Sequence, residues 1–204
     1  MNIQKYIKGS DSLAHVYLML SATSSMLSAA IGTFTKKKYN HISISFDEEL
    51  NEVYSFGRLN PNNAFIGGFS RERVTSNFYL KAEIQLYKLE VTDEEMESLR
   101  MIVQRYDKHQ DLYYYNLLGL ITAWLKIPWE RPNTYFCSEF ISTLLIEADV
   151  LTRDFIPSIT TPHEIIDALN PPMHFEGFMW QYKLQDLPKG YIQRFKNFVQ
   201  IHLP

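Results

Sequence analysis

Several features that mark common protein classes are missing from this sequence of 204 residues. It has one cysteine, which excludes an internal disulfide framework and a cysteine-rich zinc site, and a lone thiol fits a reducing compartment. Basic residues are not in excess, because 20 Lys and Arg stand against 23 Asp and Glu, a formal net charge of −3. Since duplex-binding proteins are more often basic, no nucleic-acid partner is expected.

Long hydrophobic runs are missing as well. The two longest, residues 13–20 and 117–125, are far shorter than the roughly 20 apolar residues that a membrane span needs. The first ten residues contain no apolar core of a secretory signal. These absences lead us to expect a cytoplasmic protein.

Internal boundaries are also missing, since no repeat, low-complexity tract or Gly/Ser/Pro-rich linker divides the chain. Hydrophobic residues make up 46% and charged residues 21%, a balance that excludes a disordered chain. The length suits one domain with its own core. We therefore predict a single α+β domain over residues 1–204, with a core of about 13–170 and a C-terminal extension at 171–204.

Hydrophobic spacing locates the predicted elements. Strands are predicted at 15–21, 41–46, 52–56 and 83–91. Helices are predicted at 23–34, 92–106, 112–125 (buried) and 137–148, with another starting at Thr161-Pro162. The Asn- and Gly-rich stretch 57–69 is predicted to be an ordered surface loop.

The predicted strand 41–46 places His41, Ser43 and Ser45 on one face and apolar side chains on the other. It forms a hairpin with strand 52–56 through a five-residue loop, residues 47–51. In an unbulged hairpin of this kind Ser55 shares the face of His41, and Glu52 does not. If Ser45 pairs with Asn51, Ser55 lies directly opposite His41. A one-residue bulge would favour Glu52 instead.

The single cysteine lies at the predicted helix start, in Tyr135-Phe136-Cys137-Ser138-Glu139-Phe140. Unpaired N–H groups there favour a thiolate, and Asn133 or Thr134 is the expected cap. Two observations oppose this. Cys137 also begins an apolar stripe, as buried and inert cysteines do, and the nearby Glu139 carboxylate disfavours a thiolate.

A nucleophilic cysteine needs a base, usually a histidine, and the chain has six. His41 is the favoured candidate because its neighbours on the strand face are small serines. The alternative is a structural histidine with satisfied hydrogen bonds. His163 is expected at the surface in the first turn of a helix, and His174 is left open.

In order and spacing, these residues resemble a known family. A histidine opens a strand in Tyr39-Asn40-His41-Ile42-Ser43, a polar residue follows on the next strand, and the cysteine starts a late helix. This arrangement, over residues 16–148, resembles the circularly permuted papain-like fold of the NlpC superfamily, in particular its YiiX/YebB-like branch. The resemblance implies an antiparallel sheet packed against the helix that carries the cysteine.

The resemblance also implies a cysteine amidase or peptidase, or acyl transfer. Cys137 would be the nucleophile, His41 the base and Ser55 the third catalytic residue, although Ser55 is a weaker orienting group than a carboxylate. Residues that flank these positions are the predicted substrate-binding set. They are Tyr39, Asn40, Gly57, Arg58, Tyr135 and Ser138, with loop 57–69 as one wall of the cleft.

Two alternatives remain at this point. One is a ligand-binding module on the same fold that has lost turnover because Ser55 orients poorly. The other is a lipid-directed acyltransferase or deacylase that contacts membranes through residues 117–125, although a core helix is the favoured interpretation there. The substrate is a small molecule, a peptide or an acyl lipid. No motif suggests a metal, nucleotide or flavin, since Gly67-Gly68 lacks the lysine of a phosphate loop, and no cofactor is predicted.

Overall fold

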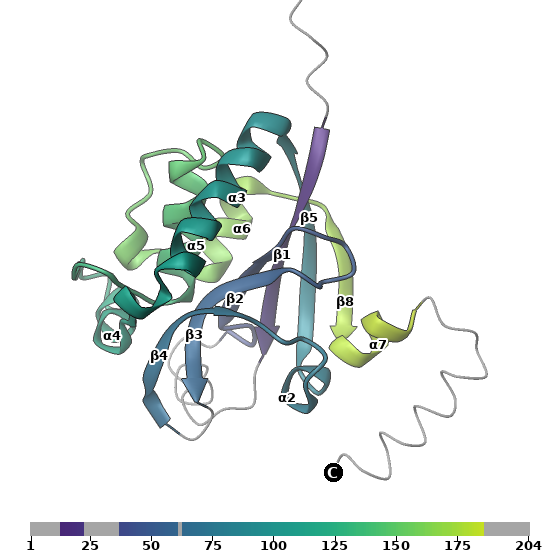
Figure 1. The fold of residues 1–204 in the computed structure, drawn as a ribbon, viewed down its shortest axis with the longest axis horizontal. Coiled ribbons are helices and arrows are strands. Elements are labelled where there is room, and N and C mark those ends of the chain that lie inside the picture. Colours follow the sequence, from purple (N-terminus) through teal and green to yellow (C-terminus); the bar gives the residue numbers. More distant parts are fainter. Residues whose placement is uncertain (1–12, 23–36, 61–62, 186–204) are drawn as a thin grey trace, which may run out of the picture.

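The structure is a computed structural model that describes residues 13–22, 37–60 and 63–185. It is an α+β protein with one six-stranded antiparallel sheet in the order β4-β3-β2-β1-β5-β8 (Figure 1). The strands are β1 Leu13–Ala22, β2 His41–Ser45, β3 Val53–Asn60, β4 Asn63–Arg71, β5 Glu83–Thr92 and β8 Met173–Phe178. A small parallel pair consists of β6 Tyr114–Tyr115 and β7 Thr134–Tyr135.

In the part of the chain that the structure describes, the helices follow the first four strands. Among the described residues they are α2 Asn77–Leu80, α3 Asp93–Lys108, α4 Leu117–Trp124, α5 Cys137–Glu147, α6 Pro162–Leu169 and α7 Met179–Leu184. Helices α3, α5 and α6 are confirmed, and so are the Thr92–Glu95 capping box of α3 and the Thr161 cap of α6, which is followed by proline. The predicted helix 23–34 lies outside the described residues.

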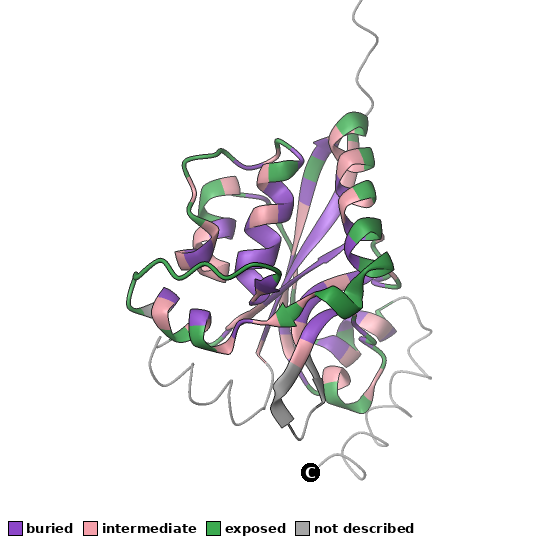
Figure 2. Ribbon diagram, turned by 60° about the vertical axis from the view of Figure 1, so that its left-hand side comes forward, coloured by how far each residue is buried: buried purple, intermediate pink, exposed green. Residues whose placement is uncertain are grey.

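The sheet has two covered faces, because alternate residues of each strand point to opposite sides. On one side Val16, Leu18 and Leu20 of β1 pack in a core with residues of α3, α5 and α6. On the other, Tyr17 and Met19 pack with residues of α7, and with part of α2. We call these the α5 face and the α7 face. Figure 2 shows buried residues along the sheet and α5.

The prediction of a surface loop at 57–69 is wrong. Most of this stretch belongs to β3 and β4, which pair from Tyr54 with Arg71 to Asn60 with Asn63. Gly67 has a packing role there, since a Cβ built at this position would lie 2.7 Å from the Gly57 carbonyl oxygen and 2.7 Å from the Tyr115 Cβ. Glycine at this position allows β6 to approach the hairpin closely. The prediction failed because it took a high glycine content as the sign of a loop.

The predicted helix at 112–125 is shorter and more exposed than expected. It begins at Leu117, after the strand β6, and Asn116 caps it by accepting a hydrogen bond from the Gly119 N–H at 2.9 Å. Leu118 and Ile121 are 53% and 54% exposed, so the helix is not a buried core element. Its apolar residues face a pocket and the surface.

The C-terminal extension predicted from residue 171 is part of the main sheet as far as it is described. β8 pairs with β5 along Glu83–Phe178 to Tyr87–Met173, and α7 follows it onto the α7 face. The Tyr182 hydroxyl donates to the Glu48 carbonyl at 2.7 Å, which ties α7 to the β2–β3 turn. Residues 173–184 therefore belong to the same sheet and to the elements that cover it.

Candidate active site

Cys137 is the first residue of α5, as predicted, but the cap differs. Phe136 occupies the cap position, and its backbone N–H donates to the Glu139 carboxylate at 3.2 Å. Thr134 lies instead in β7, where its hydroxyl donates to the Arg131 carbonyl. Cys137 is 3% exposed, and its Sγ lies 4.0 Å from the Asn40 carbonyl oxygen, next to His41.

His41 is the first residue of β2 and lies between two partners. Its side chain lies close enough to that of Cys137 to interact with it, and its Nε2 lies 2.7 Å from Oε1 of Glu72. Burial lowers the pKa of His41, but the Glu72 charge and the interactions with Cys137 and Glu72 outweigh it and raise that pKa. The arrangement stabilises an imidazolium ring beside the thiol.

Glu72 is a residue of this site that the sequence motifs do not predict. This residue directly follows β4, two strands away from β2, and its backbone N–H donates to the Val53 carbonyl at 2.8 Å. Its second carboxylate oxygen accepts a hydrogen bond from Ser43 Oγ at 2.6 Å, and Tyr79 also interacts with the carboxylate. Burial raises the pKa of Glu72, but the His41 charge and these hydrogen bonds lower it overall.

Ser55 does not occupy the predicted third position. Ser45 pairs with Val53 rather than with Asn51, so the register differs by two residues from the one that would bring Ser55 opposite His41. The Ser55 hydroxyl donates to the backbone carbonyls of Ile42 and Phe56, at 3.0 and 3.2 Å. Ser55 shares the face of His41 as expected, but the orienting contact comes from Glu72.

Glu139 is the carboxylate that was expected to disfavour a thiolate at Cys137. It is buried, and it accepts hydrogen bonds from neutral groups. Burial raises its pKa to about 7, against the lowering effects of hydrogen bonds from the Phe136 N–H and the Asn116 side chain. At neutral pH much of Glu139 therefore carries a proton. The negative charge near the thiol is correspondingly smaller than the sequence suggests.

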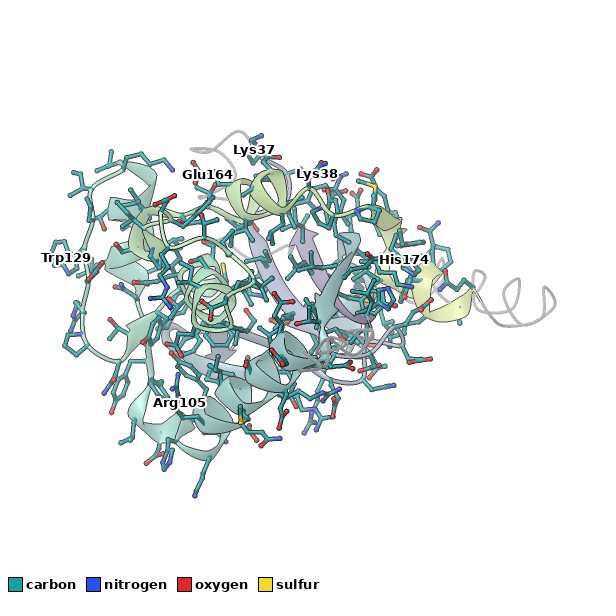
Figure 3. All side chains as sticks on the ribbon, turned by 90° about the horizontal axis from the view of Figure 1, so that it is seen from above. Lys37, Lys38, Arg105, Trp129, Glu164 and His174 are labelled. Carbon is teal, nitrogen blue, oxygen red and sulfur yellow. The ribbon has the colours of Figure 1, made fainter. Side chains whose placement is uncertain are left out.

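A pocket of about 520 Å³ opens beside Cys137. One wall is aliphatic and comes from α4, and another comes from the start of α6 and the residues before it. The lining residues are Lys37, Tyr39, Asn40, Leu117, Leu120, Ile121, Ala123, Lys126, Phe136, Cys137, Ser138, Thr160, Thr161, Pro162, His163 and Glu164. Figure 3 labels Lys37 and Glu164, which lie on the same side of the molecule.

The predicted binding residues divide between this pocket and other places. Tyr39, Asn40 and Ser138 line the pocket. Gly57 lies beside His41, because a Cβ built there would be 3.7 Å from the His41 Cε1. Among the side chains of the predicted cleft wall at 57–69 that the structure describes, none belongs to the pocket lining given above.

Tyr135 and Arg58 complete the predicted set. Tyr135 belongs to an aromatic cluster, with its ring centroid 5.1 Å from that of Phe56 and 5.8 Å from that of Tyr106. It therefore supports the core and does not line the pocket. Arg58 lies on β3, and its side chain lies outside the described part of the chain.

His163, expected at the surface, is half-buried and lines the pocket. Its Nε2 lies 3.0 Å from the Tyr39 carbonyl oxygen. Burial and the Lys37 charge lower the pKa of His163, so the neutral ring donates its Nε2–H to that carbonyl. This contact anchors the backbone that leads through Asn40 into His41.

Comparisons with protein-family models, curated proteins and solved structures gave no match to this chain. Within the described residues, no helix has the length and apolar character needed to cross a membrane. In the same part of the chain, no cluster of three or more His, Cys, Asp or Glu side chains is arranged to hold a metal ion. Function must therefore be argued from the arrangement of Cys137, His41 and Glu72.

Proposed function

We propose that this protein is a cysteine hydrolase that cleaves an amide or ester acyl bond, on a permuted papain-like fold. One observation carries the proposal: the His41 ring contacts the Cys137 side chain and the Glu72 carboxylate at the same time. Acyl cleavage by a thiol requires a nucleophile in contact with a base, and an acceptor that orients this base.

The mechanism follows from these contacts. The Cys137 sulfur attacks the acyl carbon, and its proton resides on His41, whose charge Glu72 stabilises. The backbone N–H of Cys137, at the start of α5, would donate to the developing oxyanion. His41 then gives its proton to the leaving group, and a thioester remains on Cys137. Water, deprotonated by His41, releases the acid and restores the thiol.

Two features of the fold support the proposal, although they do not identify a family. His41 precedes Cys137 in the chain, and α5 packs against the antiparallel sheet near β2 and β3. Both features agree with the order and packing that the resemblance implies. The inactive binding-module alternative depended on Ser55 as a weak orienting residue, and Glu72 removes that reason.

The test is the rate of Cys137 alkylation by iodoacetamide as a function of pH. We expect the wild type to react well below about pH 8, the usual range of a free thiol, and the His41→Ala variant to lose that reactivity. His174→Ala is the matched control, because His174 contacts Glu48 and not Cys137. A thiol that stays inert until denaturation in all three proteins would contradict the proposal.

Turnover separates an enzyme from a binding module. We expect Cys137→Ala to abolish hydrolysis of acyl substrates while the protein remains folded by circular dichroism. Equal turnover by the wild type and Cys137→Ala would place the reaction elsewhere.

A further inference from the structure

We propose that the pocket beside Cys137 binds the aliphatic chain of the acyl group, so that the substrates are esters or thioesters of unbranched fatty acids. This inference rests on the proposed function, because the chain must end in a carbonyl at the thiol. It goes further by assigning the chemical class of the acyl part.

The first observation is the character of the α4 wall. Leu117, Leu120, Ile121 and Ala123 present only aliphatic groups to a cavity of about 520 Å³. Cavities of this size, about 300–1,000 Å³, commonly enclose small organic ligands. Each methylene transferred from water to such a wall contributes about 0.8 kcal/mol. A longer alkyl chain therefore gains affinity here until the cavity is filled.

The second observation concerns polar groups at the end of α4 and on the opposite wall, several of which are already bonded within the protein. Lys126 Nζ donates to both carboxylate oxygens of Glu164, at 2.7 and 2.9 Å, and to the Ile159 carbonyl at 3.1 Å. The Thr160 hydroxyl donates to the Ile156 carbonyl at 2.8 Å. These groups contribute wall surface and have these hydrogen bonds in place before a ligand enters.

Two polar side chains near the thiol are also bonded within the protein. The Thr161 hydroxyl donates to Glu164 at 2.9 Å, and the His163 Nε2–H donates to Tyr39. A peptide brings an N–H and a carbonyl with every residue, and each one buried without a partner costs about 1–3 kcal/mol. An alkyl chain has no such groups. The pocket therefore favours an alkyl chain over a peptide.

The chemical step needs no reactant beyond the substrate and water. A carbon–sulfur bond forms between the acyl carbon and Cys137, and the bond to the leaving oxygen or sulfur breaks. The proton held by His41 goes to that leaving atom. Water then adds to the acyl carbon, the carbon–sulfur bond breaks, and the fatty acid leaves as Cys137 regains its proton.

The experiment measures kcat/KM for p-nitrophenyl acetate, butyrate and octanoate with the full chain, after subtraction of spontaneous hydrolysis. We expect octanoate to exceed acetate by about tenfold or more, since a single added methylene in a hydrophobic pocket can change kcat/KM by about 10–200-fold. Mass spectrometry should detect an octanoyl group on Cys137 during turnover.

Two tryptophan variants on α4 locate the binding site. Leu120→Trp fills the pocket and should lower the octanoate-to-acetate ratio by about tenfold. Leu118→Trp is the matched control, because Leu118 is 53% exposed on the same helix and is not part of the pocket lining described above. That variant should keep the wild-type ratio.

The outcomes separate the inference from the function on which it rests. Cys137-dependent hydrolysis that does not increase from acetate to octanoate overturns the inference and supports the hydrolase. Faster cleavage of peptidyl anilides than of octanoate has the same meaning. Esters that never acylate Cys137 and are never cleaved in a Cys137-dependent way overturn the proposed function itself.

Discussion

Two buried glutamates lie near the thiol, and they differ in charge. Glu72 is 9% exposed and Glu139 is 4% exposed, so burial raises the pKa of each. Glu72 contacts the His41 ring and accepts from Ser43, and its pKa is lowered overall. Glu139 has hydrogen bonds from neutral groups only, and its pKa is raised to about 7.

The comparison teaches that a neighbouring cation, and not burial, decides whether such a carboxyl carries charge. Hydrogen bonds from the Phe136 N–H and Asn116 do not compensate for the desolvation of Glu139. The imidazolium of His41 does so for Glu72. One carboxyl is therefore suited to hold a charge for catalysis, and the other to cap a helix as a largely neutral group.

Glu72 and Glu139 also make the folding stability depend on pH in opposite directions. The lowered pKa of Glu72 stabilises the folded state above the usual value of 4.5, and this contribution is lost as pH falls. The raised pKa of His41 gives stability that is complete below 6.5 and lost as pH rises through its folded pKa. The raised pKa of Glu139 does the reverse of Glu72, and stability falls between pH 4.5 and about 7.

Removing the charge of Glu72 should have the largest effect. In Glu72→Gln the imidazolium loses its counter-charge, so we expect kcat to fall on the order of 10³-fold and alkylation of Cys137 to shift to higher pH. The matched control is Glu52→Gln, because Glu52 pairs with Arg100 at the surface. An unchanged pH profile in Glu72→Gln would remove Glu72 from the mechanism.

Removing the ionisable group of Glu139 should have a moderate effect, and this effect is a gain in stability where the Glu72 variant loses activity. In Glu139→Gln the amide oxygen still accepts from the Phe136 N–H, but no buried charge forms. We expect urea denaturation to show the variant more stable than the wild type at pH 8, by on the order of 2 kcal/mol, and no gain at pH 4. A constant difference across this range would show that Glu139 does not titrate as proposed.

The smallest effect is expected for Ser55→Ala. This variant loses hydroxyl contacts to the carbonyls of Ile42 and Phe56, which should cost about 1 kcal/mol of unfolding free energy. The alkylation profile of Cys137 should match the wild type, because Ser55 does not orient His41. A profile that shifts as in Glu72→Gln would return Ser55 to the site.

Local patterns in the sequence predicted much of this arrangement. Alternation along β2 placed His41, Ser43 and Ser45 on one face, and the pairing of β1 with β2 agrees with it. Cap signals placed the starts of α3 and α6. Such predictions succeed because the physical cause lies within a few residues of the chain.

Glu72 could not be found in this way, because its partner lies across another strand. It reaches His41 only after β3 and β4 form a hairpin from a stretch that composition assigns to a loop. The available signal was Asn60-Pro61-Asn62-Asn63, a turn-like string between two runs that contain phenylalanine. Interpreting it as a hairpin would have put Glu72 at the end of a strand.

The small sheet of β6 and β7 has a consequence for how this protein can change. Tyr114 pairs with Thr134, and the Asn116 N–H donates to the Tyr135 carbonyl at 2.9 Å, so the two ends of segment 116–133 are held together. Because loop-closure entropy increases slowly with length, insertions between closed ends are tolerated. We therefore expect the length and sequence of the segment that carries α4 to be variable, while Cys137, His41 and Glu72 stay in place.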